Sequence, residues 1–315
     1  MEKSKKYTVK QTKATEEGLG VYVNLLTDFG FKRIFGIKDV MIHFLNTVLA
    51  KDIKDRIVDL HYDNTERLGV TKHDRKAIYD LFCSTEKGER FIVEIQALWQ
   101  EFYKDKALFY STYLVQDQNV RNKEWDFKLQ PVYMVNIVNF LLDENDPDSK
   151  KYTSYVQLID RKTHKIFYDK LTFVYIELPR FTKELKDVRS FFEKWIYLIS
   201  NLHNMDGKPS RKFTDKVFGQ LFEEAKIARM TKKEKNSYYI SLKNLSNMNL
   251  AKIELNKLHN TIAIMGNDLA ARDNTIAIMG NDLAAIKKAY AAKEKAYAAK
   301  EKENAELRRK LGLLN

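Results

Sequence analysis

The chain of 315 residues is 44% hydrophobic and 12% aromatic, which is enough apolar material for a folded core and excludes a globally disordered protein. Its formal net charge of +12 favours negatively charged partners, nucleic acid first and an anionic membrane surface second. Residues 1–18 lack the apolar stretch of a signal peptide, no run approaches the roughly 18 apolar residues of a membrane span, and Cys83 is the single cysteine. We therefore expect a cytoplasmic protein without disulfides or membrane insertion.

The first predicted elements are helices. Apolar residues recur at intervals of three and four between residues 28 and 49, and Gly36 predicts a break between two helices there. An extended segment at 57–62 alternates apolar and polar residues. A hairpin follows, in which a Glu-Lys-Gly turn joins strands at 76–84 and 90–98.

The rest of the predicted core alternates helices and strands. Residues 99–121 have helical spacing of apolar residues without Gly or Pro. Two strands rich in β-branched and aromatic residues are predicted at 132–142 and 171–178, and a weaker strand at 152–159. Helices are predicted at 191–202 and 212–230. This order predicts an α/β fold with a mixed central sheet flanked by helices.

A heptad pattern begins near Leu255. The segment NTIAIMGNDLAA occurs at 260–271 and again at 274–285, an offset of two heptads, and KAYAAKE also occurs twice. With Leu255 at position a and Leu258 at position d, most a and d positions are apolar, which predicts pairing of helices between chains in a dimer or higher oligomer. The alternative is a solitary or folded-back helix. Polar residues interrupt the seam at four positions, Arg272, Lys293, Lys300 and Asn304. The helix could also break locally at Gly266 and Gly280.

Two carboxylates stand in the predicted hairpin where core residues are expected, Asp80 and Glu94. Because side chains alternate along a strand, Glu94 and Gln96 share one face, and pairing of the hairpin brings Asp80 close to both. Converging carboxylates repel each other unless a cation lies between them, and their oxygens suit Mg²⁺. Such an ion can activate water and stabilise the charge of phosphodiester cleavage. The alternative is that these residues form the solvated face of the hairpin.

Other chemical motifs are not found. The six histidines have no zinc-site spacing, and neither GxxxxGK[ST] nor GxGxxG occurs. Basic runs at 210–213 and 230–235 predict either contacts with a DNA backbone or solvated helix surface.

Several segments, taken in their order and spacing, resemble a known family. They are TDFGFKRIFG at 27–36, FLN at 44–46, IYDLFC at 78–83, VEIQ at 93–96, FYSTYL at 109–114, LQPVYMVNIVNFLL at 129–142 and IELPRF at 176–181. The chain thereby resembles the PD-(D/E)XK nuclease superfamily, and within it the Rpn group of recombination-promoting nucleases, often labelled transposases.

The resemblance implies a restriction-endonuclease-like domain at 21–250, between a flexible N-terminus at 1–20 and the coiled-coil tail at 251–315. It implies a DNA endonuclease that promotes recombination or acts on mobile or invading DNA. Mg²⁺, with Mn²⁺ as a substitute, would be held by Asp80 and Glu94. Gln96 stands where the superfamily name has lysine; its amide can orient water or phosphate but supplies no positive charge.

The missing charge has two candidates, Lys32 and Lys76. The first helix of this fold often contributes an acid, for which Asp28 fits best, although Asp28 could equally be a helix N-cap. Weaker candidates for the site are the loop acids Asp63 and Asp74, and Tyr110, for which core packing is the alternative.

Two other functions stay open for this fold. One is a non-catalytic DNA-binding or scaffolding protein, and the other is a strand-joining transposase. If the tail pairs two cores, each active site could address one strand of a DNA duplex.

Overall fold

The computed structural model describes residues 20–50, 52–67, 77–118, 127–143, 150–207 and 209–310. Residues 1–19 of the predicted N-terminal segment, Asp74 and Lys76 lie outside the described residues. The chain forms two compact units, Met1–Asn249 and Leu250–Asn315.

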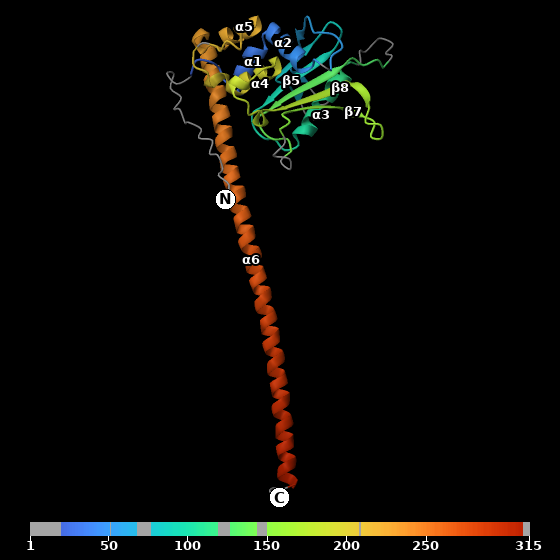
Figure 1. The fold of residues 1–315 in the computed structure, drawn as a ribbon, viewed down its shortest axis with the longest axis vertical. Helices are drawn as coiled ribbons and strands as arrows, with labels where there is room; N and C mark the ends of the chain where they lie inside the picture. Colours follow the sequence, from blue (N-terminus) through green and yellow to red (C-terminus); the bar gives the residue numbers. More distant parts are fainter. Residues whose placement is uncertain are drawn as a thin grey trace. The chain divides into compact units, whose positions relative to one another are not determined.

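A six-stranded mixed sheet forms the centre of the first unit (Figure 1). Its strands, in spatial order, are β1 His61–Tyr62, β4 Leu81–Ser84, β5 Arg90–Gln96, β6 Val132–Val138, β8 Ile166–Glu177 and β7 Thr153–Ile159. The neighbours β5, β6 and β8 are parallel, and the other neighbouring pairs are antiparallel. A separate antiparallel pair consists of β2 Glu66–Arg67 and β3 Ala77–Ile78.

Helices cover both faces of the six-stranded sheet, which confirms the predicted α/β fold. One face is covered by α1 Asp28–Phe35, α2 Lys38–Val48, α4 Phe191–Asn201 and α5 Lys216–Ala225, and the other by α3 Tyr103–Gln116 (Figure 1). Alternating strand residues serve the two cores: Val93 and Val135 pack with the four helices, whereas Ile92 and Met134 pack with α3. Short 3₁₀ turns lie at Leu178–Arg180, Leu185–Asp187, Leu202–Asn204 and Ile227–Arg229.

The predicted continuous strand at 76–84 is wrong. Ala77 and Ile78 belong to β3 and pair with β2, and a bend at Asp80 separates them from β4. The bend replaces the regular ladder with side-chain hydrogen bonds, because the Asp80 amide donates to the Glu94 side chain and the Asp80 carboxylate accepts from Ile95 N. The strand is therefore interrupted at the residue that carries the first carboxylate.

The predicted extended segment at 57–62 contains only a two-residue strand, β1. Ile57 uses both of its backbone groups on one side chain: its N–H donates to Asn46 Oδ1 at 2.8 Å, and its carbonyl accepts from Asn46 Nδ2 at 2.8 Å. This start of the segment is thereby fixed to α2 instead of to a neighbouring strand.

The helix α6 Lys232–Lys310 begins within the first unit. Its first turns are fixed to the α1 region, since Arg33 Nη1 lies 2.5 Å from Glu234 Oε1 and the buried Tyr238 hydroxyl accepts from Asn24 N at 2.7 Å. A third contact joins Phe29 N to Ser241 Oγ at 3.2 Å. These turns are part of the folded core of the first unit.

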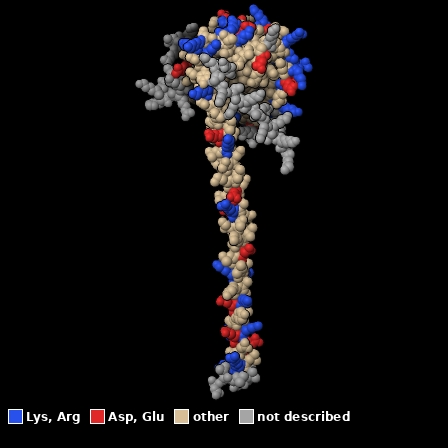
Figure 2. Space-filling view, turned by 90° about the vertical axis from the view of Figure 1, so that its left-hand side faces the viewer, with Lys and Arg blue, Asp and Glu red and all other residues tan. Residues whose placement is uncertain are grey.

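The second unit holds the remainder of α6. The helix continues through Gly266 and Gly280 without a break. The a and d side chains are exposed in the single chain; Leu269 is 62% and Met279 65% exposed. Figure 2 shows both signs of charge along this helix and Lys and Arg side chains spread over the visible face of the first unit. Among the described residues, no helix has the length and apolarity needed to cross a membrane.

Candidate active site

Two hydrogen bonds join Asp80 to Glu94 and to its neighbour Ile95. The Asp80 amide donates to Glu94 Oε1 at 3.0 Å, and Ile95 N, next to Glu94, donates to Asp80 Oδ2 at 2.8 Å. The antiparallel register that pairs Leu81 with Val93 puts Asp80 opposite Glu94. The sheet itself therefore holds the two carboxylates together.

Burial makes this pair hard to ionise. Glu94 is only 3% exposed, and burial together with the nearby Asp80 carboxylate raises its pKa to about 8, against an opposing effect of Lys106. Burial also raises the pKa of Asp80, while the Ile95 N–H and then Lys32 oppose the rise. Two adjacent carboxylates with raised pKa values require a nearby cation to be ionised together near neutral pH.

Lys106 was not among the predicted site residues, yet it lies at the carboxylate pair. Its Nζ is 3.7 Å from Glu94 Oε2 and lies over the rings of Tyr110 and Tyr103, 5.1 and 5.6 Å from their centroids. The Tyr103 hydroxyl in turn donates to Asn136 Oδ1 at 3.0 Å, which seats the start of α3 on β6. The sequence signal was a lysine between two aromatic residues at helical spacing, directly after the strand that carries Glu94.

Asp28 and Lys32 also lie near the pair. Lys32 Nζ is 2.7 Å from Asp28 Oδ1, and both charges act on the Asp80 carboxylate. The N-cap of α1 is Thr27, whose Oγ1 accepts from Gly30 N at 3.0 Å, so the alternative role of Asp28 as the cap is wrong. A side chain at Gly30 would place Cβ 2.2 Å from Asn24 O, so the tight start of α1 needs glycine here.

Gln96 is on the same strand as Glu94, two residues further on, so the strand alternation places both on the α3 side of the sheet. Its carbonyl accepts from Asn139 N at 2.9 Å. The side chain is half-buried, and within the described part of the chain its amide has no hydrogen-bond partner.

The weaker candidates have other contacts. Tyr110 packs edge-to-face on Tyr79 with ring centroids 5.4 Å apart, in addition to lying under Lys106. Asp63 lies beside the buried Cys83, whose pKa is raised by burial and then by this carboxylate. One oxygen of Asp63, Oδ2, is buried without a hydrogen-bond partner among the described residues.

Residues of both predicted basic runs make contacts within the fold. Lys212 Nζ donates to Val188 O at 3.0 Å, which ties the segment before α5 to the segment before α4. The second run forms the first turn of α6, where Glu234 pairs with Arg33.

A divalent cation fits the carboxylate pair. Within the ranges that the structure describes, no group of three or more His, Cys, Asp and Glu side chains is arranged to hold a metal. Mg²⁺ nevertheless often takes only one or two protein carboxylates and fills its other positions with water and substrate phosphate. A cation bound there would lower the raised pKa of Glu94, because it favours the ionised carboxylates.

The mixed sheet, its flanking helices and the carboxylate pair define an α/β protein of the restriction-endonuclease type. Residues 25–260 match the family described as PD-(D/E)XK nuclease family transposase, and the chain belongs to this family. This confirms the resemblance and supports a nuclease or transposase type of function with DNA as the partner; nucleases of this superfamily typically use divalent metals. Comparisons with curated proteins and with solved structures gave no match.

Proposed function

We propose that the protein is a metal-dependent DNA endonuclease that hydrolyses phosphodiester bonds and promotes recombination or acts on mobile or invading DNA. The observation that carries this proposal is the pair of the half-buried Asp80 and the buried Glu94, held together by the hydrogen bonds of Asp80 N to Glu94 and of Ile95 N to Asp80, and next to Lys106. A pair of this kind is costly for folding, because both groups are desolvated, and such costs are typical of functional sites.

The residues of the candidate site would have different roles. Asp80 and Glu94 would hold Mg²⁺, for which Mn²⁺ could substitute, and the ion when bound supplies charge stabilisation and a more acidic water. Gln96 would orient the attacking water or a phosphate oxygen through its amide. Asp28 would be the acid that α1 contributes to the site, paired with Lys32; the charge of Lys32 favours the ionised form of Asp80, and that of Asp28 opposes it.

Lys106 would supply the positive charge that the neutral Gln96 lacks. The Lys106 side chain is 24% exposed, so its ammonium group borders solvent while it approaches the enclosed carboxylate of Glu94. Lys32 is 44% exposed and already lies 2.7 Å from Asp28. The geometry therefore favours Lys106 over Lys32 as the cation for a DNA phosphate.

The tail would join two or more chains. A helix with exposed a and d side chains such as Leu269 and Met279 gains stability by burying them against another helix. Paired tails would bring together two nuclease domains, each of which could cut one strand.

Cleavage of supercoiled plasmid in the presence of Mg²⁺ tests the proposal. We expect the parent to nick and linearise the plasmid, and Asp80→Asn and Glu94→Gln to lose this activity while remaining folded. Asp63→Asn is the matched control, since Asp63 is a half-buried acid on the neighbouring strand segment. Variants at Asp80 and Glu94 that cut as fast as the parent would refute the assignment. A parent that retards DNA in a gel but never cuts it would be a DNA-binding scaffold instead.

A further inference from the structure

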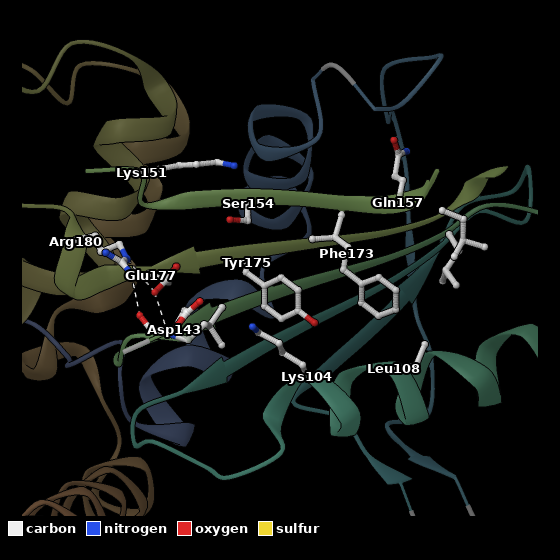
Figure 3. Close-up of a pocket in the computed structure, with 14 residues that line it drawn as sticks. Lys104, Leu108, Asp143, Lys151, Ser154, Gln157, Phe173, Tyr175, Glu177 and Arg180 are labelled. Atoms are coloured by element: carbon white, nitrogen blue, oxygen red, sulfur yellow. Dashed lines mark hydrogen bonds and ion pairs between the residues drawn. The ribbon is translucent and has the colours of Figure 1, made fainter. Parts of the chain in front are cut away.

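A cavity of about 640 Å³ lies on the α3 side of the sheet (Figure 3). Phe173 and Tyr175 of β8 form its floor, and Figure 3 shows Lys104 and Leu108 reaching over them from α3. The strand β7, including Val156, closes the outer side. The volume is within the range of roughly 300–1,000 Å³ that is typical of ligand pockets.

The cavity lies two strands away from the carboxylate pair, on the same face of the sheet. The strand registers pair Glu94 with Asn136, Asn136 with Tyr175, and Tyr175 with Ser154. Because neighbouring strands are about 4.8 Å apart, the β8 position of Tyr175 is roughly 10 Å from that of Glu94. At this separation a nucleotide near the phosphate bound at the carboxylates can reach the cavity.

The walls of the cavity suit a planar apolar group. The Phe173 and Tyr175 rings are almost parallel, at 9°, with centroids 6.4 Å apart. The apolar side chains around this floor remain open to solvent: Leu108 is 52%, Val156 45% and Leu158 53% exposed. Phe173 and Tyr175 are themselves only 9% and 7% exposed, so each presents a limited part of its ring to the cavity. Aromatic rings are the usual stacking surface for bases of single-stranded nucleic acid.

Polar groups that already have partners lie at the two ends of the cavity. At one end Arg180 Nε lies 3.0 Å from Glu177 Oε2, which also accepts from Leu142 N at 2.9 Å. Gln157 is at the opposite end in Figure 3, where its Nε2 donates to Thr172 Oγ1 at 2.9 Å. Lys104 places positive charge at one side, where a phosphate would be attracted.

We propose that this cavity receives an unpaired nucleotide of the DNA substrate next to the cleaved phosphate, and that the enzyme therefore prefers DNA with unpaired nucleotides to continuous duplex. The inference rests on the proposed nuclease function. A base in a duplex must leave its stack and its partner before it can enter a walled cavity, and this cost is lowest when the base is already unpaired.

The test compares a continuous duplex, the same duplex with a short bulge, and a bulge whose residues are abasic. We expect the parent to cut the normal bulge about tenfold faster than the duplex, and to lose this preference with the abasic bulge. Val156→Trp, which lies opposite Phe173 in the strand register and would fill the cavity, should lower the ratio several-fold. Ile159→Trp is the control, because Ile159 is 51% exposed on the same strand but does not line the cavity.

Leu108→Trp repeats the test from α3 if Val156→Trp fails to fold. A parent that cuts duplex and bulge at equal rates, or a filled cavity that keeps the parental ratio, overturns the inference while the nuclease function stands. A change in oligomeric state without a change in the ratio overturns it too, and assigns this side of the sheet to a second copy of the chain.

A parent that cuts no DNA refutes the proposed function, and the cavity is then tested by binding. The probe is a bulge that contains 2-aminopurine, whose fluorescence is quenched on stacking. We expect the parent and Ile159→Trp to quench it and Val156→Trp to leave it bright. Equal fluorescence with all three proteins overturns the inference.

Discussion

Lys106 Nζ lies 3.7 Å from Glu94 Oε2 and joins the first turns of α3 to the strand that carries the buried carboxylate. The contact connects an ammonium group that borders solvent with an acid that is almost fully enclosed. The superfamily name PD-(D/E)XK has a lysine two residues after the second acid. This protein has Gln96 at that position, two residues after Glu94, and Lys106 of the next helix lies beside Glu94 instead.

Replacing Lys106 by Met should lower the rate of DNA cleavage by about 10²–10³-fold, the usual effect of removing one group that stabilises charge in the transition state. Lys106→Arg should keep part of the rate. The measurement is single-turnover cleavage at saturating protein, so that weaker DNA binding does not count. Lys87→Met is the control, because Lys87 is exposed and pairs with Asp55 away from the carboxylates. A larger loss from Lys32→Met than from Lys106→Met would assign the cation to α1.

Without metal, the stability of the protein should fall as the pH rises. The pKa of Glu94 is raised in the fold from 4.5 to about 8, so the folded state holds a proton that the unfolded state has released. The stabilisation from that proton is complete below about pH 4.5 and is lost as the pH rises through 8. Asp80 acts in the same direction.

Glu94→Gln should therefore flatten the dependence of the free energy of unfolding on pH between about 5 and 8, as measured by urea denaturation in the presence of a chelator. Glu86→Gln, an exposed change in the turn of the same hairpin, should leave the slope as it is in the parent. Mg²⁺ should restore stability to the parent at high pH and have no such effect on Glu94→Gln. A parent whose stability is flat across this range would contradict the burial of Glu94 as a protonated acid.

Tyr238→Phe should destabilise the first unit. The Tyr238 hydroxyl is the acceptor for the buried Asn24 N–H at 2.7 Å, and its loss leaves that donor unpaired, which costs about 1–3 kcal/mol. Tyr239→Phe is a matched control one residue further on, with a side chain that is 43% exposed. Thermal unfolding of both variants measures the difference. Equal melting temperatures would show that the start of α6 does not contribute to the core.

Much of the fold follows from local sequence patterns. The two helices separated at Gly36 and the helix at 191–201 agree closely with their predicted positions, because each has a regular apolar spacing. The weaker strand predicted at 152–159 is also present, as β7. The first part of β8 was not predicted, because polar residues interrupt it. Ile166 and Tyr168 pair with β7 there, although neither lies in an apolar run.

The site was predictable only in part. The approach of Asp80 to Glu94 follows from hairpin pairing, whereas the bend at Asp80 depends on its hydrogen bond with Ile95 N, fifteen residues away. Thr27 rather than Asp28 caps α1, and both residue types favour that position, so the sequence alone could not separate them. Lys106 reaches Glu94 only because α3 crosses the sheet in a particular direction, which is a tertiary property.

The repeated segment of the tail allows a deletion that keeps the heptad phase. Removing residues 260–273 deletes one copy, two heptads, and leaves every later a and d position in register; it shortens a helix by about 21 Å. Removing 260–269 deletes fewer residues but shifts the seam around the helix. We expect the first deletion to keep the number of chains per oligomer of the parent and the second to dissociate the oligomer, as measured by light scattering. Far-ultraviolet circular dichroism should show that both tails remain helical. If the two deletions behave alike, or if the parent itself is a monomer, the a and d seam does not hold chains together.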